Sequence, residues 1–178
     1  MKRLGEDGFW INYSRQLLEK VQVRDSLQER AQLVREWFGT EYAPTVQLAA
    51  GAVELLAQLK EAGYILGVIS NRSQPFHDVL EQLEIADWFD LTLAAGDIGY
   101  WKPNAAIFHH ARSYFTDLAA AECLYVGDNY FADGLGAKKA GMMPVIFDPE
   151  GLYGEMSFPC ITELGQVTAV LQNTVSVP

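Results

Sequence analysis

Polar residues able to bind a phosphoryl group and a metal ion follow three separate segments of the chain. The apolar run 65–69 ends in Ser70 and Asn71, Lys102 lies just before Pro103, and the apolar run 124–126 is followed by Gly127 and Asp128, with Asp133 shortly after. A hydroxyl can donate to a phosphoryl oxygen, and a lysine brings it a point positive charge. Carboxylates are hard oxygen ligands suited to Mg²⁺. These residue types together indicate phosphoryl chemistry.

Each of these residues has a plainer explanation when it is taken alone. Ser70 and Asn71 can cap the helix that follows them. Lys102 can be a surface lysine, and Asp128 can lie in a solvated turn beside a helix-capping Asp133. Their shared position argues for the functional interpretation, because ligands of open parallel sheets bind at the carboxyl ends of the strands. We therefore expect Ser70, Lys102 and Asp128 to surround one cleft.

The N-terminal part of the chain has the pattern of a helical hairpin. Apolar residues recur at helical spacing in two stretches within residues 9–38. Between them, Ser26 with Glu29 three residues later is a capping-box signature for the second helix. We expect a small helical unit over residues 1–43 and a larger unit over residues 44–178.

From residue 51 onward the pattern alternates between strands and helices. Continuous apolar runs at 65–69 and 144–147 are typical of central parallel strands, whereas the alternation at 89–93 is typical of an edge strand. The pattern predicts helices at 52–62, 76–83, 104–115, 131–140 and 161–171, and strands at 65–69, 89–93, 124–126 and 144–147. It therefore predicts an α/β fold with a doubly wound, Rossmann-like parallel sheet.

Composition excludes several classes of partner. The net charge of −10 provides no basic surface for nucleic acid or acidic lipid. No apolar run approaches the roughly 18 residues that a membrane helix needs, and no signal peptide opens the chain. Cys123 and Cys160 have no metal-binding or disulfide spacing, which fits a reducing cytoplasm. The sequence does not indicate an oligomeric state.

Read together, the three segments resemble the haloacid dehalogenase superfamily of hydrolases. The run ending in Ser70 is similar to the family's second motif, Lys102-Pro103 to the third, and Gly127-Asp128 with Asp133 to the fourth. The resemblance covers residue 44 to the end of the chain. The hairpin before it is similar to the small helical cap that many members carry.

The resemblance implies a role for each of these residues. Ser70, Asn71 and Lys102 would bind the phosphoryl group, with Ser70 and Lys102 acting in catalysis. Asp128 would hold Mg²⁺, and Asp133 would support the metal or orient Lys102. The Gly-Asp form of the fourth motif favours a phosphatase over a dehalogenase. The implied substrate is a small phosphorylated metabolite.

One departure from the family pattern is large. The family's first motif is an apolar strand ending in Asp-x-Asp that supplies the nucleophile, and nothing in residues 1–50 matches it. We therefore expect a sheet that lacks its central first strand, with a gap or a foreign neighbour between the runs 65–69 and 124–126. A chain that starts after this motif is the simplest explanation, and such a chain has no phosphatase turnover.

Three other interpretations remain open at this point. A circularly permuted chain would use the strand 145–147 and Asp148 as the nucleophile. A non-catalytic relative would use Ser70, Lys102 and Asp128 to bind a phosphorylated ligand or a protein. A phospho-accepting signalling domain ranks last, because its acidic residues should precede the hydroxyl-bearing strand.

Overall fold

The structure is a computed structural model that describes residues 6–40, 45–154 and 156–175. The chain divides into two compact units, residues 1–47 and 48–178. The smaller unit holds two helices that pack against each other, α1 (Glu6–Lys20) and α2 (Leu27–Thr40), as the helical spacing predicts. Ala31 and Ser14 are its buried side chains among the described residues.

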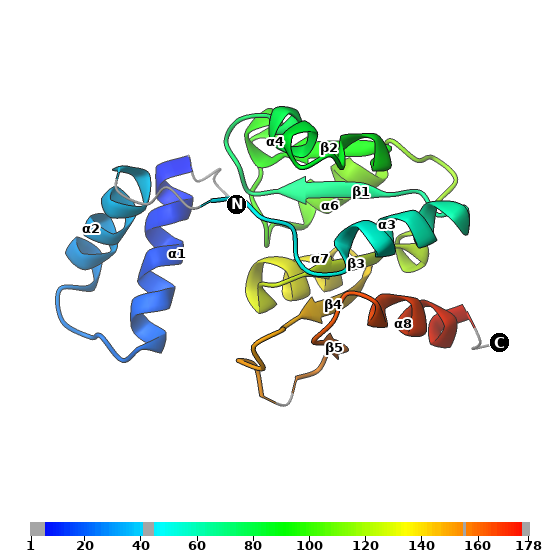
Figure 1. Cartoon of the computed structure of the whole chain (residues 1–178). Coiled ribbons are helices and arrows are strands. Elements are labelled where there is room, and N and C mark those ends of the chain that lie inside the picture. Colours follow the sequence, from blue (N-terminus) through cyan, green and yellow to red (C-terminus); the bar gives the residue numbers. More distant parts are fainter. Residues whose placement is uncertain (1–5, 41–44, 155, 176–178) are drawn as a thin grey trace. The chain divides into compact units, whose positions relative to one another are not determined.

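The larger unit alternates strands and helices (Figure 1). Its strands are β1 (Gly67–Ser70), β2 (Leu91–Ala94), β3 (Leu124–Gly127), β4 (Met143–Phe147) and β5 (Cys160–Ile161). Its helices are α3 (Ala52–Glu61), α4 (His77–Gln82), α5 (Ala95–Ile98), α6 (Ala105–Arg112), α7 (Leu135–Lys139) and α8 (Gln166–Val175). Short turns η1 (Ala86–Trp88), η2 (Ala120–Glu122) and η3 (Tyr130–Gly134) connect them.

The strands form two parallel sheets rather than one. β1 pairs with β2, while β4 pairs with β3 on one side and β5 on the other. β2 is an edge strand, as its alternating pattern predicts. Among the described residues, β1 and β3 are not paired with each other. The expected interruption between the runs 65–69 and 124–126 is therefore present.

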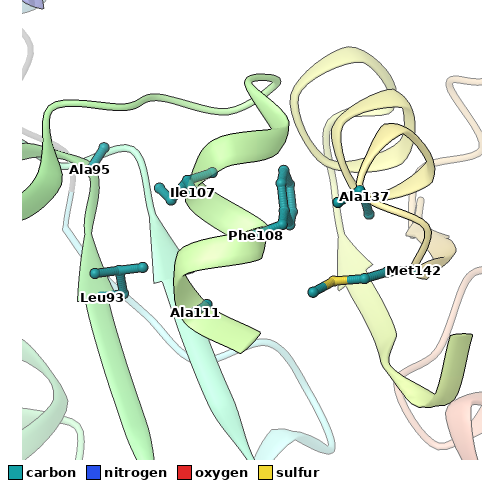
Figure 2. Packing of buried hydrophobic residues seen from close by; sticks show 8 residues of the cluster. Leu93, Ala95, Ile107, Phe108, Ala111, Ala137 and Met142 are labelled. Atoms are coloured by element: carbon teal, nitrogen blue, oxygen red, sulfur yellow. The ribbon is translucent and has the colours of Figure 1, made fainter. Parts of the chain in front are cut away.

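Helices pack on both faces of the strands, which makes the fold doubly wound. α6 carries the largest buried cluster, and its two most buried side chains face opposite ways (Figure 2). Ile107 lies near Leu93 of β2, and Phe108 lies near Ala137 of α7. On the other face, Leu55 of α3 and Val167 of α8 share a cluster with Val145 of β4.

The last part of the chain differs from the prediction. The expected helix at 161–171 begins only at Gln166, and Cys160–Ile161 is a short strand. The Ile161 carbonyl accepts a hydrogen bond from the Asp148 amide at 2.8 Å, so its backbone belongs to the sheet. The Gln166 side chain then accepts from the amides of Thr162 and Glu163, which holds a turn ahead of the helix.

Within the described ranges, no helix is long and apolar enough to cross a membrane.

Candidate functional site

Lys102 joins the carboxyl ends of the two sheets. Its ammonium donates to the Ile69 carbonyl of β1 at 3.1 Å and to the Tyr125 hydroxyl of β3 at 3.0 Å. It also forms an ion pair with Asp133 at 2.7 Å. The side chains of Lys102 and Asp133 are only 12% and 4% exposed. Because an ammonium has three N–H donors, all of them are used within the protein.

Two side chains fix the position of Lys102 from opposite directions. The Asn71 amide, just after β1, accepts from the Lys102 amide at 2.7 Å and donates to the Lys102 carbonyl at 3.0 Å. Asp133 uses one carboxylate oxygen for the Lys102 ammonium and the other for the Asn129 amide at 2.9 Å. Asn71 thus contacts the backbone of Lys102, and Asp133 contacts its charge. The contact of Asp133 with Lys102 is the one that orienting Lys102 requires.

A π-helical turn directs Asp133 back toward the end of β3. Asn129 starts this turn, since its side-chain oxygen accepts from the amides of Phe131 and Ala132. The amides of Asp133 and Gly134 both reach the Asn129 carbonyl. π-helical turns occur frequently at functional sites, where they redirect a side chain.

Gly127 is required at the end of β3 for steric reasons. A Cβ atom at Gly127 would overlap the carboxylate carbon of Asp133. The Asp133 carboxylate cannot move away easily, because Lys102 and Asn129 hold its two oxygens. The glycine of the Gly127-Asp128 pair is therefore explained by packing against Asp133.

We expect Gly127→Ala to lower the free energy of unfolding by about 1–3 kcal/mol, the usual cost of overpacking. Gly165→Ala is the matched control, because nothing lies within 4 Å of a Cβ atom at Gly165. Urea unfolding of both variants measures the difference. Equal stabilities would contradict the steric role of Gly127.

Ser70 and Asp128 lie at the same end of the strands and keep polar atoms available. The Ser70 hydroxyl oxygen accepts from the Arg72 amide at 3.3 Å, which leaves its own hydrogen free to donate. Helix α4 begins only at His77, so Ser70 and Asn71 do not cap it. The Asp128 side chain is exposed and makes no hydrogen bond within the described part of the chain. Its carbonyl accepts from the Tyr153 hydroxyl at 3.2 Å, which fixes its backbone.

Asp128 offers an unbonded carboxylate for a metal at this end of the strands. Both oxygens of Asp133 are engaged, and the described ranges hold no group of three His, Cys, Asp or Glu side chains placed for a metal ion. Mg²⁺ commonly binds through one or two carboxylates, with waters and substrate phosphate completing its shell. Asp128 fits that pattern with an unbonded carboxylate, whereas each oxygen of Asp133 already accepts a hydrogen bond from the protein.

Asp148 is not arranged as a nucleophile. It follows β4, which lies between β3 and β5 and not beside β1. Its carboxylate is buried and accepts from the amides of Leu152 and Tyr153 at 2.9 and 2.8 Å. Both oxygens thus hold a turn. The circularly permuted alternative is therefore wrong for this chain.

Tyr125 belongs to the site although the sequence analysis did not select it. Its ring packs edge-on against Phe108, and its hydroxyl lies within 3.4 Å of the Ile69 carbonyl and of Asp133. Burial raises the pKa of Tyr125 to about 12. Burial alone would lower the pKa of Lys102, but Tyr125 and Asp133 outweigh it and hold that pKa above its usual value. A tyrosine in an apolar strand needs a polar partner, which was the available signal.

These pKa shifts predict a loss of stability in alkali. The folded state keeps protons on Tyr125 and Lys102 that the unfolded chain releases near pH 10, so their contribution is complete below that pH and falls above it. Tyr125 alone accounts for about 2 kcal/mol between pH 10 and pH 12. Urea unfolding across this range measures the free energy of unfolding at each pH. This free energy should decline less steeply in Tyr125→Phe than in the exposed control Tyr64→Phe. Identical slopes would contradict the buried position of the hydroxyl.

Comparison with known proteins places the chain among related sequences and folds. Residues 10–147 match the family described as haloacid dehalogenase-like hydrolase. The chain is 30% identical over 135 residues to haloacid dehalogenase-like hydrolase domain-containing protein 3 of Bos taurus, with 75% of this chain and 53% of that protein covered. It is 34% identical over 131 residues to glyceraldehyde 3-phosphate phosphatase of Pyrococcus furiosus, with 68% and 53% covered.

A solved structure of a related protein has a similar fold. The 2-haloacid dehalogenase of Pseudomonas syringae pv. Tomato DC3000 superposes with a TM-score of 0.64 at 26% identity, with 94% of this chain and 71% of that chain covered. The chain spans about half the length of the curated relatives it matches.

Proposed function

Because the chain belongs to the haloacid dehalogenase-like hydrolase family, we propose that its site binds a small phosphorylated metabolite together with Mg²⁺, as a phosphatase site that lacks its own nucleophile. The observation that carries this proposal is the Lys102 network, which holds a buried positive charge against the Ile69 carbonyl, just before Ser70, and against Asp133. Its relative from Pyrococcus furiosus is a phosphatase of a small phosphorylated sugar.

Each side chain has a distinct role in this proposal. The Ser70 hydroxyl donates to a phosphoryl oxygen. Lys102 stays an ammonium at neutral pH and supplies positive charge, and a phosphoryl oxygen can replace the Ile69 carbonyl as one of its acceptors. Asn71 is a positioning residue, because both polar atoms of its amide are bonded to the Lys102 backbone.

Asp128 is the residue that would hold Mg²⁺, with Asp133 positioning Lys102 instead. The metal, when bound, would neutralise charge on the transferring oxygens. Among the acidic residues considered for attack on phosphorus, Asp133 and Asp148 already accept hydrogen bonds through both oxygens, and Asp128 is assigned to the metal. We therefore propose that this chain alone binds phosphate without turning a phosphate ester over.

A second candidate is hydrolysis of a carbon–halogen bond, because the chain is 26% identical to a 2-haloacid dehalogenase. A carbon–halogen bond carries no charge that Mg²⁺ would neutralise. Its hydrolysis therefore does not explain an exposed carboxylate that can bind Mg²⁺ at the end of β3. Asp128 therefore favours phosphate chemistry. The ligand 2-chloropropionate separates the two candidates.

Calorimetric titration with inorganic phosphate tests the proposed function. Mg²⁺ should raise phosphate affinity in the wild type. Asp128→Asn should reduce that gain by at least about tenfold, since even outer-shell changes at metal sites lower metal affinity or activity about 10–100-fold. Asp117→Asn, an exposed acid on another loop, is the matched control. Tighter binding of 2-chloropropionate than of phosphate, or an Mg²⁺ effect that survives Asp128→Asn, would overturn the proposal.

A further inference from the structure

The peptide unit that follows Asp128 is held at both of its polar groups. Its carbonyl, that of Asp128, accepts a hydrogen bond from the Tyr153 hydroxyl at 3.2 Å. Its amide, that of Asn129, donates to the Asp133 carboxylate at 2.9 Å. Because a peptide unit is planar, two hydrogen bonds on its opposite edges fix its orientation. The backbone from which the Asp128 side chain extends is therefore fixed by Tyr153 and Asp133 together.

The Tyr153 hydroxyl also satisfies the first amide of the π-helical turn. The Tyr130 amide donates to the same hydroxyl oxygen at 3.3 Å. The first amides of a helix have no partner within that helix, and the Asn129 side chain accepts from the next two, those of Phe131 and Ala132. The hydroxyl thus bonds to the residue before Asn129 and to the residue after it, which a phenylalanine at position 153 could not do.

Asp148 fixes the loop that carries Tyr153. It directly follows β4, its side chain is buried, and its two oxygens accept from the amides of Leu152 at 2.9 Å and Tyr153 at 2.8 Å. These hydrogen bonds tie the loop backbone to the end of a strand that is paired on both sides. A buried acid that the proposed function leaves unused therefore has a role in placing Tyr153.

Aromatic packing holds the ring of Tyr153 as well as its backbone. The ring centre lies 6.2 Å from that of Tyr130. The Tyr130 ring lies 5.2 Å from that of Phe158, which is buried, and the ammonium of Lys138 on α7 lies 5.3 Å from the centre of the Phe158 ring. Rings at such separations attract each other. The Tyr153 hydroxyl is therefore presented to Asp128 by a supported ring.

We propose that Tyr153 is a positioning residue for the metal at Asp128, an inference that rests on the proposed function. The Asp128 carboxylate is exposed and makes no hydrogen bond within the described part of the chain, so its backbone decides where its oxygens can lie. Groups that orient a metal ligand from behind typically change metal affinity or activity by about 10–100-fold when they are removed. Tyr153 is placed to act in this way through the Asp128 carbonyl.

A purely structural role for Tyr153 leads to different expectations. If only the ring mattered, phenylalanine would replace it without loss. If the whole site depended on the loop, metal and phosphate would both bind more weakly. The positioning role requires the hydroxyl and affects the metal alone, because the Lys102 ammonium already uses its three donors on Ile69, Tyr125 and Asp133.

Mn²⁺ affinity at saturating inorganic phosphate, measured from the electron paramagnetic resonance signal of free Mn²⁺, tests the proposal. Tyr153→Phe should weaken Mn²⁺ binding at least about tenfold, and Tyr153→Leu should weaken it no less. Phosphate affinity without metal, measured by calorimetry, should stay within about twofold of the wild type in Tyr153→Phe. Tyr114→Phe is the matched control, because the Tyr114 hydroxyl contacts His110 at 3.5 Å and Tyr114 is 60% exposed.

Hydrogen exchange without metal tests the contact of Tyr153 separately. The Tyr130 amide loses its acceptor in Tyr153→Phe and should exchange about fivefold faster, the effect of one ordinary hydrogen bond. The Asn129 amide, which Asp133 holds, should change less. Unchanged exchange at Tyr130 would overturn the proposal.

The outcomes distinguish this inference from the proposed function. Mn²⁺ binding that Asp128→Asn removes and Tyr153→Phe leaves unchanged would overturn the positioning role and leave the proposed function in place. Equal losses of Mn²⁺ affinity and of metal-free phosphate affinity in Tyr153→Phe would also overturn the positioning role, since Tyr153 would then act on the structure alone. A wild-type protein that binds no Mn²⁺ beside phosphate would overturn both.

Discussion

Replacing Lys102 by methionine is expected to lower the free energy of unfolding by about 3–5 kcal/mol. The ammonium of Lys102 is the ion-pair partner of Asp133, whose side chain is 4% exposed. Without it, a buried charge remains unpaired, and the Ile69 carbonyl loses its cationic donor. Urea unfolding at neutral pH measures the change.

Two further variants make this prediction specific. Lys139→Met removes an exposed lysine from the end of α7 and should change the free energy of unfolding by no more than about 0.5 kcal/mol. Asp133→Asn in the Lys102→Met background removes the unpaired charge, so the double variant should be more stable than Lys102→Met alone. Lys102→Met with the stability of Lys139→Met would contradict the ion pair as the link between β1 and β3.

Absence of turnover is the second large effect that we expect. With Mg²⁺ present, we expect this chain to release p-nitrophenol from p-nitrophenyl phosphate no faster than buffer, because the proposed site assigns Asp128 to the metal and Asp133 to Lys102 and so has no carboxylate left for nucleophilic attack. Ser70 and Lys102 can still stabilise a phosphoryl group, but loss of a nucleophile typically leaves a small fraction of the rate. A chain extended by an apolar strand ending in Asp-x-Asp is the comparison.

A rate comparison together with the Asp128→Ala variant can contradict the expected absence of turnover. If the unextended chain releases p-nitrophenol at a rate comparable to the extended chain, and Asp128→Ala abolishes that release, then a described or undescribed residue acts as the nucleophile. Asp148→Asn would be the first variant to measure. The hydrogen bonds of Asp148 to Leu152 and Tyr153 lead us to expect no change in rate from it.

Most of the fold was predictable because it depends on local pattern. Continuous apolar runs predicted β1, β3 and β4, and the alternation near Leu91 predicted an edge strand. The interruption between β1 and β3 followed from the absence of an apolar strand ending in Asp-x-Asp within residues 1–50. The short strand β5 was missed, because two residues carry no periodicity and their pairing with β4 depends on the fold.

The sequence predicted which residues share the candidate site, but not which contacts they make. Position after a strand indicates that Ser70 and Asp128 share one end of the sheets. It gives no information on which atoms bond. The pattern did not predict that the Asn71 side-chain amide bonds to the Lys102 backbone. Tyr125 contacts Lys102 and Asp133 only because α6 and the π-helical turn bring separate segments together.

The most direct test of the account is whether one metal and one phosphate share a site at Asp128. Mn²⁺ in place of Mg²⁺ broadens the ³¹P resonance of a phosphate bound beside it, and this readout needs no turnover. We predict strong broadening of inorganic phosphate with the wild type and with Asp117→Asn, and its loss with Asp128→Asn. Broadening that persists in Asp128→Asn, or its absence in the wild type, would contradict a phosphoryl and metal site built on Ser70, Lys102 and Asp128.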